Sequence, residues 1–340
     1  MSLVIGSTVD GYEILDYVDS SSKRISYRAR NKSAQRIEQL QILPDAIRSE
    51  PERSARFFRE SRILSSLQHP NIVTFYGAVE VGGCLALSME SLEAVTLKDR
   101  LELGPMEIDD AARTILQIIA AADAAHAAGV VHREISPANI LITPENLVKL
   151  AGFAAAKAAG DVNLTRAGML VGDVYYTAPE VFKGLATMDP RVDVYSIGCV
   201  FYALVTGRPP FTPKGEYQVM MAHVMEPPVP PSLLNPKLNS ILDAVILKAL
   251  AKDPAARYAS AREFYAAIVD PSSVTSHPPP VPQVAAPPAP AASQLPAPPP
   301  PASESVRLLP ALLAAAFGAI VLISAFLILS ATRSIATNIP

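Results

Sequence analysis

Polar side chains that could do chemistry gather in one short stretch of the sequence, residues 132–141, which read HREISPANIL. Glu134 supplies a carboxylate, Ser136 a hydroxyl and Asn139 an amide. Such groups suit proton transfer and hydrogen bonding, but their types and spacing alone do not select one reaction. The function of this stretch must therefore be inferred from the motifs in the rest of the chain.

The stretch resembles the catalytic loop of protein kinases, which reads HRDxKPxNIL. Further landmarks of that family follow in family order and spacing, at residues 148–154 (VKLAGFA, for VKLxDFG), 178–180 (APE), 193–198, 204–211 and 253–258. The ordered set covers about residues 10–270 and most resembles bacterial serine/threonine kinases. It implies an α+β, bilobal protein-kinase-like fold, with a small β-rich lobe followed by a large helical lobe.

The positions that grip the phosphates of ATP in this family carry other residues here. The resemblance places Asp19, Ser21 and Arg24 at the three glycines of the phosphate loop, where a Cβ would block close approach of the backbone. Gln41 stands at the phosphate-binding lysine and is neutral, whereas its usual partner, Glu60, is present. Arg24 could replace the missing cation, although a solvated loop arginine is the simpler interpretation.

The positions that surround the adenine are also changed. Gln39 replaces a small alanine and Ser26 replaces a valine. The larger glutamine should fill part of the nucleotide site, and both residues make this normally apolar site more polar. Met89 and Leu141 stand at the remaining nucleotide-site positions that the resemblance implies.

The catalytic and metal positions are the most altered. Glu134 replaces the catalytic aspartate, and its extra methylene would displace the carboxylate by about 1 Å. Ser136 replaces the loop lysine, while Asn139, a magnesium ligand in the family, is retained. Gly152 replaces the aspartate of DFG and offers no carboxylate to a metal. We therefore predict no intact catalytic set and no cofactor, with ATP and Mg²⁺ kept as an alternative.

Positions that hold the kinase fold together are retained. The resemblance implies a stacked spine formed by Phe75, Leu64, Phe153 and His132. It also implies a buried ion pair between Glu180 and Arg257, and it makes Asp193 the residue that holds the catalytic loop. Thr165, in the segment expected to be the activation loop, could accept a phosphate, but an unmodified surface threonine is the simpler expectation.

Hydrophobic periodicity supports the same order of elements. It predicts strands at 12–15, 25–29, 35–43, 72–79 and 85–89, and helices at 51–67, 109–128, 192–206 and 238–251.

Composition divides the 340-residue chain into a globular part, a linker and an apolar segment. Residues 271–306 are rich in proline and alanine and predict an extended linker, with a ligand for a proline-recognising domain as the alternative. Within the predicted transmembrane helix, residues 307–332, the 24 residues 308–331 carry no charge, which is enough for a helix across about 30 Å of membrane. A short tail, 333–340, follows, so the helix resembles a tail anchor, and we expect the kinase-like region in the cytoplasm.

The net charge of −3 disfavours nucleic acid as a partner. The spacing of Cys84 and Cys199 fits no metal or redox motif, so two reduced thiols are expected.

We predict a membrane-tethered pseudokinase that acts as a scaffold or allosteric regulator of a cytoplasmic protein, such as an active kinase. The alternatives are a weak or unconventional ATP-dependent serine/threonine kinase that uses Arg24 and Glu134, and an inert structural membrane protein.

Overall fold

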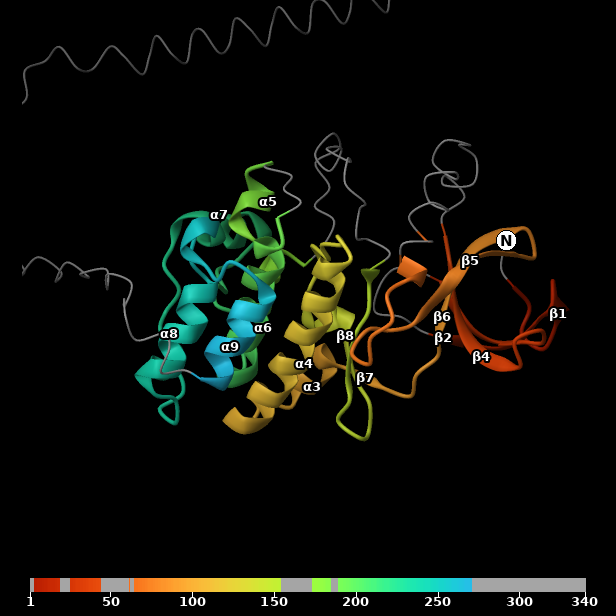
Figure 1. Ribbon diagram of the computed structural model, residues 1–340, viewed down its shortest axis with the longest axis horizontal. Helices are drawn as coiled ribbons and strands as arrows, with labels where there is room; N and C mark the ends of the chain where they lie inside the picture. The colour runs from red at the N-terminus through yellow and green to blue at the C-terminus, as the bar shows by residue number, and fades with distance from the viewer. Residues whose placement is uncertain are drawn as a thin grey trace, which may run out of the picture. The chain divides into compact units, whose positions relative to one another are not determined.

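Six antiparallel strands form the sheet of the N-terminal lobe, in the order β1-β2-β3-β4-β6-β5 (Figure 1). The strands are β1 (Thr8–Val9), β2 (Tyr12–Val18), β3 (Ser26–Asn31), β4 (Arg36–Ile42), β5 (Phe75–Val81) and β6 (Cys84–Glu90). A two-residue turn joins β5 to β6 through Gly82 and Gly83, which both have positive φ. Glycine adopts this conformation without strain, and its twist matches that of paired strands.

The chain is described here from a computed structural model, which covers residues 3–18, 25–43, 61, 64–153, 173–184 and 189–270. All of these residues belong to one of the two compact units of the chain, residues 1–282.

Alternation along β4 separates two faces of the sheet. Leu40 is fully buried in a small core with Tyr12, Ile14 and Tyr27, whereas Gln39 and Gln41 are only partly buried. Because successive side chains of a strand point to opposite faces, the two glutamines lie on the face away from this core.

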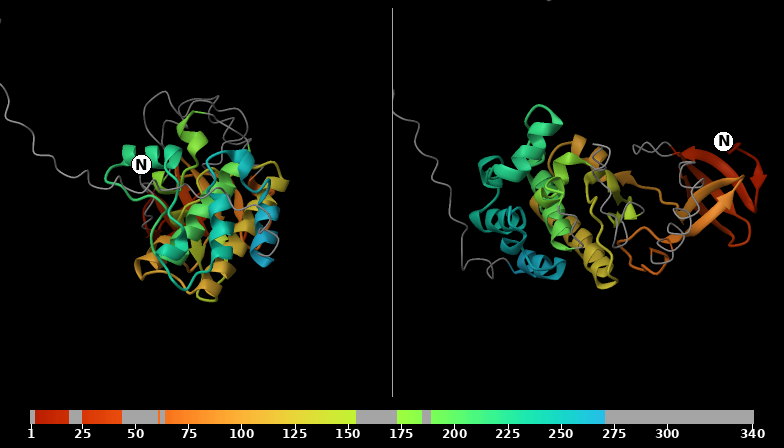
Figure 2. Two further views of the ribbon diagram at one scale, coloured as in Figure 1. Left: turned by 90° about the vertical axis from the view of Figure 1, so that its left-hand side faces the viewer. Right: turned by 90° about the horizontal axis from the view of Figure 1, so that it is seen from above.

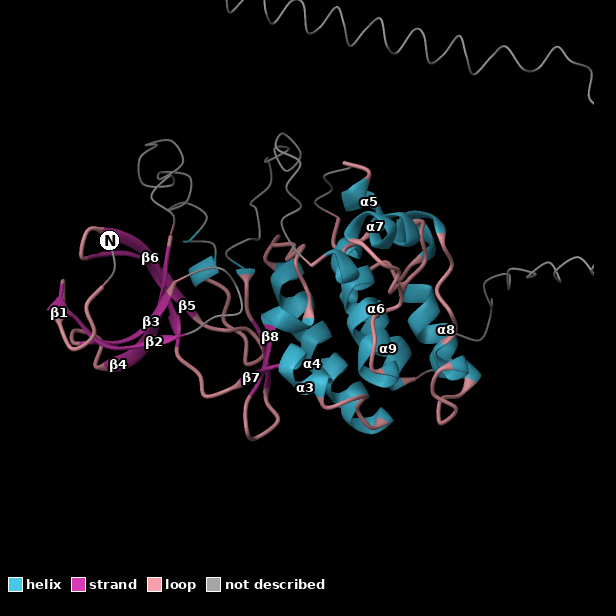
Figure 3. Cartoon of the chain, turned by 180° about the vertical axis from the view of Figure 1, so that it is seen from behind, coloured by secondary structure: helices cyan, strands magenta, loops and turns pink. Residues whose placement is uncertain are grey.

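Helices dominate the C-terminal lobe, and the strands of the six-stranded sheet lie apart from them in the N-terminal lobe (Figure 3). The helical elements are α3 (Leu97–Glu102), α4 (Ile108–Ala127), η1 (Pro137–Asn139), η3 (Val174–Tyr176), α5 (Pro179–Phe182), α6 (Arg191–Thr206), α7 (Glu216–Met225), η4 (Pro231–Leu233), α8 (Ser240–Ala249), η5 (Pro254–Ala256) and α9 (Ala261–Val269). A small antiparallel sheet, β7 (Val95–Thr96), β8 (Ile140–Ile142) and β9 (Val148–Leu150), accompanies them.

Helix α6 is the centre of the main core. Nearly all of its residues are buried, which is the pattern of a helix that is apolar all round and enclosed by its neighbours. Helices α4 and α8 pack against it, and α9 packs against both α4 and α6 (Figures 1 and 2). Gly207 ends α6 in the left-handed conformation, with φ of 79°, where glycine avoids a Cβ clash.

The predicted α+β arrangement and most of its elements are confirmed. Among the long helices, 109–128, 192–206 and 238–251 correspond to α4, α6 and α8. The strand predicted at 72–79 begins later, at Phe75. Just before it, Val73 N–H donates to the Leu150 oxygen of β9 and Thr74 N–H donates to the Glu90 side chain, so these N–H groups do not continue the ladder between β5 and β6.

Several predicted segments fall outside the described residues. These are most of the helix at 51–67, the loop 19–24, the linker 271–306, the membrane segment 307–332 and the tail 333–340. Within the residues that the structure describes, no helix is both long enough and apolar enough to cross a membrane.

Candidate functional site

One face of the N-terminal sheet carries the residues predicted to contact a nucleotide. Strand pairing sets Ser26 opposite Gln41 and Gln39 opposite Met89. Directly paired residues share a face, so hydroxyl and amide side chains replace the apolar surface expected there. Ser26 is fully buried, and its Oγ has no hydrogen-bond partner among the described residues. The face is therefore polar and uncharged at positions 26, 39 and 41.

An ion pair joins the end of this sheet to the C-terminal lobe. Lys149 on β9 donates from Nζ to Glu90 Oε2 at 2.8 Å, and the backbone N–H of Thr74 donates to the same oxygen at 3.1 Å. Burial alone would raise the pKa of Glu90, but these hydrogen bonds and the charge of Lys149 outweigh it, and the pKa is lowered. An isolated bridge between Ile72 and Leu150 adds a backbone link between β9 and the residues just before β5.

Asp193, at the start of α6, holds the catalytic-loop stretch in place. Its carboxylate accepts the backbone N–H groups of His132 at 2.8 Å and Arg133 at 2.7 Å, and it contacts His126 Nε2 at 2.8 Å. Burial would raise the pKa of Asp193, but His126, the charge of His132 and the Arg133 N–H lower it overall. Arg133 has a positive φ of 66°, so these bonds fix a sparsely populated backbone conformation. The role that the resemblance gives to Asp193 is present here.

Glu134, Ser136 and Asn139 are brought together by this loop. Asn139 ends the 3₁₀ turn η1, which begins with Pro137, a residue whose fixed φ suits the first position of a helical turn. Asn139 Nδ2 donates to the backbone oxygen of Glu134 at 2.8 Å, and the Asn139 N–H donates to the oxygen of Ser136 at 3.0 Å. Ser136 is buried, and Glu134 is partly buried.

Gly152 lies directly against Asn139. Its φ is +88°, and a Cβ built on it would lie 2.8 Å from Asn139 Cγ and 2.9 Å from Oδ1. Real Cβ atoms essentially never approach so closely. The neighbouring residue Ala151 donates its N–H to the Asn139 backbone oxygen at 2.8 Å. Its own backbone oxygen accepts from His132 Nε2 at 2.8 Å. The position of the metal-binding aspartate is thus packed, and it carries no side chain.

The described residues do not fit a magnesium–triphosphate group. Gly152 supplies no carboxylate, Gln41 supplies no positive charge, and no cluster of three or more metal-ligating side chains occurs within the described ranges. Magnesium among phosphates is usually held by one or two carboxylates. Of the two magnesium-ligand positions that the structure describes, 139 and 152, the first keeps the family's asparagine.

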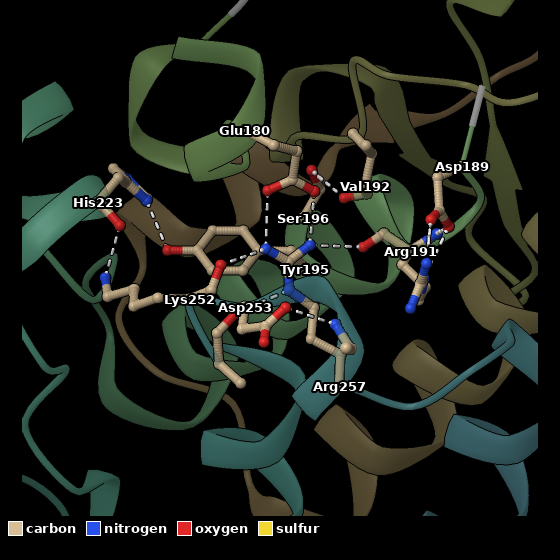
Figure 4. Close-up of polar contacts among 12 residues, drawn as sticks. Glu180, Asp189, Arg191, Val192, Tyr195, Ser196, His223, Lys252, Asp253 and Arg257 are labelled. Atoms are coloured by element: carbon tan, nitrogen blue, oxygen red, sulfur yellow. Dashed lines mark hydrogen bonds and ion pairs between the residues drawn. The ribbon is translucent and has the colours of Figure 1, made fainter. Parts of the chain in front are cut away.

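The ion pair predicted between Glu180 and Arg257 is present and buried (Figure 4). Arg257 Nη1 and Nη2 donate to the two carboxylate oxygens of Glu180 at 2.7 and 2.8 Å. The guanidinium also donates to the backbone oxygens of Arg191 at 2.9 Å and Ala251 at 2.7 Å, and it lies over the ring of Tyr195. This two-pronged pairing ties α5, α6 and the segment before α9 together.

A buried histidine lies beside that ion pair (Figure 4). His223 Nδ1 is 2.8 Å from the hydroxyl of Tyr195, and burial lowers the His223 pKa to about 3. Lys252 donates to the backbone oxygens of Ala222 and His223, lies over the ring of Phe211, and has a pKa lowered by burial to about 8. The lysine therefore satisfies carbonyl groups at the end of α7.

The spine residues lie where the resemblance expects packing. Leu64 and Phe153 belong to the main core, Phe75 packs against it, and the rings of His132 and Phe153 meet edge to face at 4.5 Å. Cys84 and Cys199 are both buried and free.

Not every predicted site residue can be placed. Gln39, Gln41, Met89, Leu141, Glu134, Ser136, Asn139 and Gly152 are described, whereas Ser21, Arg24 and Glu60 lie outside the described residues, as do Asp19 and Thr165. The Lys149–Glu90 pair was not predicted, because the two residues are far apart in the sequence and nothing local links them.

Comparison with known proteins agrees with the geometry. The model of the protein kinase domain family matches residues 25–267. Serine/threonine-protein kinase PknB of Mycobacterium tuberculosis is 36% identical over 267 residues, which cover 76% of this chain and 42% of PknB. Serine/threonine-protein kinase PknJ of the same species is 35% identical over 268 residues, which cover 77% of this chain and 45% of PknJ. The chain thus spans less than half the length of these relatives.

Solved structures show the same fold. The crystal structure of the M. tuberculosis PknI kinase domain superposes with a TM-score of 0.63 at 26% identity, covering 80% of this chain and all of that one. A β-rich N-terminal lobe and a helical C-terminal lobe are common to both, as the bilobal prediction required. The chain belongs to the protein kinase domain family.

Proposed function

We propose that the chain is a non-catalytic member of its family, a pseudokinase that uses the kinase fold as a binding module. The observation that carries this proposal is Gly152, packed against Asn139 at the position where the family has its metal-binding carboxylate. Gln41 adds the loss of the phosphate-binding cation on β4. Transition-state stabilisation in phosphoryl transfer is mainly electrostatic, so the joint loss of these charges removes its main source.

The parts that hold the fold together support a binding role. The Glu180–Arg257 pair, the Asp193 hydrogen bonds and the Lys149–Glu90 link are all formed. A fold held in this way can present a fixed surface to a partner without turnover. We propose that this partner is a cytoplasmic protein, such as an active kinase, and that the chain acts on it as a scaffold or allosteric regulator.

Membrane tethering is part of the proposal. The uncharged segment within residues 307–332 has the length and composition of a single membrane-spanning helix, and the proline-rich linker 271–306 would separate it from the kinase-like lobes. With the lobes in the cytoplasm, such a tether raises the local concentration of the module for partners at the same membrane.

The alternative is a weak or unconventional ATP-dependent serine/threonine kinase. The comparisons favour this alternative, because the matched relatives are named as serine/threonine-protein kinases. In that case Glu134 would accept the hydroxyl proton and Arg24 would replace the lysine as the cation.

Binding of Mg-ATP to the full chain separates the two proposals. The melting temperature would be measured in detergent with ATP, with ATP plus Mg²⁺, and with ATP plus a chelator, using PknB as the positive control. A ligand at 100 times its Kd stabilises a protein by about 2.7 kcal/mol, which is about 5–10 °C for a domain of this size. We expect no magnesium-dependent rise; a rise of that size would support the kinase alternative.

A further inference from the structure

The side chain of Lys252 contacts the end of α7 (Figure 4). Its Nζ donates to the backbone oxygens of Ala222 at 3.1 Å and His223 at 2.7 Å. The same nitrogen lies 4.2 Å from the centre of the Phe211 ring. Both acceptors are neutral carbonyl groups, so neither holds the proton of the ammonium as a carboxylate would. Lys252 is only partly buried, so a reagent in solution can reach part of its side chain.

We propose that Lys252 is a site of acylation, at which a small acyl phosphate transfers its acyl group to Nζ. The geometry allows this reaction because a neutral amine still has two N–H groups, one for each of the two carbonyl oxygens. Deprotonation therefore keeps both hydrogen bonds and leaves a lone pair on Nζ. The proposal does not depend on whether the chain transfers phosphate from ATP.

The surroundings of Lys252 favour the neutral amine. Burial is the largest cause of its lowered pKa, which is about 8 instead of 10.5. The positive charges of Arg257 and Lys183 act in the same direction as burial, whereas Cys199 and Glu226 act in the opposite direction. A lysine becomes a nucleophile near neutral pH when it is desolvated or lies beside another cation, and both conditions are present here.

The neutral form of Lys252 is abundant at ordinary pH. With a pKa of about 8, about a quarter of the side chains are neutral at pH 7.5, against about 0.1% for a lysine of ordinary pKa. His223, which contributes one of the two carbonyl oxygens, adds no charge at this pH because burial lowers its own pKa to about 3. The neutral fraction of Lys252 therefore follows its own titration.

The transfer step balances in atoms and electrons. The lone pair of the neutral Nζ attacks the carbonyl carbon of the acyl phosphate and forms a C–N bond. The bond between that carbon and the bridging oxygen breaks, and phosphate leaves with the electron pair. Phosphate takes up the proton that Nζ loses, which gives hydrogen phosphate and an uncharged amide.

Acylation would weaken the end of α7. The new amide nitrogen carries one N–H, so it can donate to only one of the oxygens of Ala222 and His223. The positive charge near the C-terminus of the helix is lost at the same time, and such a charge is stabilising there. The last turn of α7, which ends at Met225, should therefore open more readily.

Acetylation of the full chain in detergent, measured lysine by lysine, tests the proposal. The folded chain would be treated with isotope-labelled acetyl phosphate between about pH 6.5 and pH 10, and the initial rate at each lysine would be measured by mass spectrometry. Lys248 is the internal control. It also lies over an aromatic ring, that of Tyr258, and 35% of its side chain is exposed, but the Glu263 carboxylate accepts from its Nζ at 3.2 Å.

The two lysines should differ in both rate and pH profile. We expect Lys252 to react at least about 5-fold faster than Lys248 at pH 7.5, and its rate to reach half of its maximum near pH 8. A hydrogen-bonding role alone would give no such profile. A rate at Lys252 that keeps rising to pH 10, or acetylation of Lys248 without acetylation of Lys252, would overturn the proposal.

Hydrogen exchange at the end of α7 tests the consequence. The N–H of Glu226 donates to the Ala222 oxygen at 2.9 Å, and we expect it to exchange about 2–5-fold faster after acetylation. Lys252→Arg is the matched control, because arginine keeps the charge and the donors but gives no stable amide, so treatment should leave its exchange unchanged. Equal exchange before and after acetylation of the wild-type chain would show that α7 does not depend on this lysine.

Discussion

Removing one partner of the buried Glu180–Arg257 ion pair should destabilise the kinase-like fold strongly. In Glu180→Ala, the guanidinium of Arg257 would keep its bonds to the oxygens of Arg191 and Ala251 but lose both bonds to the carboxylate. Arg257 has no exposed side-chain surface, and Glu180 has 7%. Arginine cannot shed its proton in a protein, so the stranded charge cannot be neutralised.

The expected loss follows from that burial. Breaking a buried, hydrogen-bonded ion pair by removing one partner lowers the free energy of unfolding by about 3–5 kcal/mol. For a domain of this size that corresponds to a fall in melting temperature of about 6–20 °C. Arg257→Ala should lose at least as much, because it also leaves backbone oxygens without donors. The double variant should lose less than the sum of the two single variants, since no charge is then stranded.

Urea unfolding of the full chain, followed by far-ultraviolet circular dichroism, measures these differences; the chain has no tryptophan to report by fluorescence. Arg262→Ala is the matched control, because its ion pair with Asp123 joins α9 to α4 at the surface, with 83% of the arginine side chain exposed. Exposed pairs contribute about 0–1 kcal/mol. A loss of less than about 1 kcal/mol in Glu180→Ala, similar to the control, would refute the reasoning from burial.

Two further changes test other parts of the fold. The pKa of His223 is about 3 in the folded chain against 6.5 unfolded, so its stabilising contribution is complete above pH 6.5 and is lost as the pH falls toward 3. Protonation of His223 on unfolding should therefore lower the free energy of unfolding by about 2 kcal/mol at pH 5. His223→Gln, which can still accept from Tyr195, should flatten the decline in urea stability between pH 7 and pH 5, and an unchanged slope would contradict this assignment. Lys149→Ala should lower the free energy of unfolding by about 1–3 kcal/mol, because it removes the cation from the Glu90 carboxylate and leaves it the hydrogen bonds of Thr74. A wild-type urea midpoint would show that this link contributes little.

Long, strongly patterned elements could be predicted from the sequence. Helix α6 was recognisable from residues 192–206, because this long stretch is largely apolar and Asp193 is its only charged residue. The start of β5 was predicted three residues early. Ile72 and Val73 are apolar enough for a strand, but the Thr74 N–H bonds to the Glu90 side chain and the Val73 N–H bonds to Leu150 of the other sheet, so the ladder with β6 is not continued there.

The interior of the N-terminal lobe held a residue that pattern alone does not predict. Glu38 is fully buried on β4, and it accepts from Ser88 at 2.5 Å, Asn31 at 3.0 Å and Arg36 at 2.7 Å. A carboxylate in a strand usually predicts exposure, because burial without partners is very unfavourable. The partners come from three different strands and could be identified only from the structure.

The site was predicted in its residue types but not in its contacts. Motif positions identified Gly152 and Asn139 from the sequence, yet their close approach depends on the φ of Gly152 and on the turn η1. The Asp193 bonds were expected from the resemblance, whereas the contact of Asp193 with His126 was not. Distances of this kind arise from tertiary packing, for which local sequence carries no signal.

Transfer of the γ-phosphate is the measurement that tests the central claim most directly. The full chain in detergent would be incubated with radiolabelled ATP and Mg²⁺, alone and with a general protein substrate, beside PknB and beside Glu134→Ala. We predict no incorporation above that of the Glu134→Ala variant, because the described site lacks the charges that would hold the triphosphate. Incorporation at a rate comparable to that of PknB, abolished in Glu134→Ala, would contradict the account.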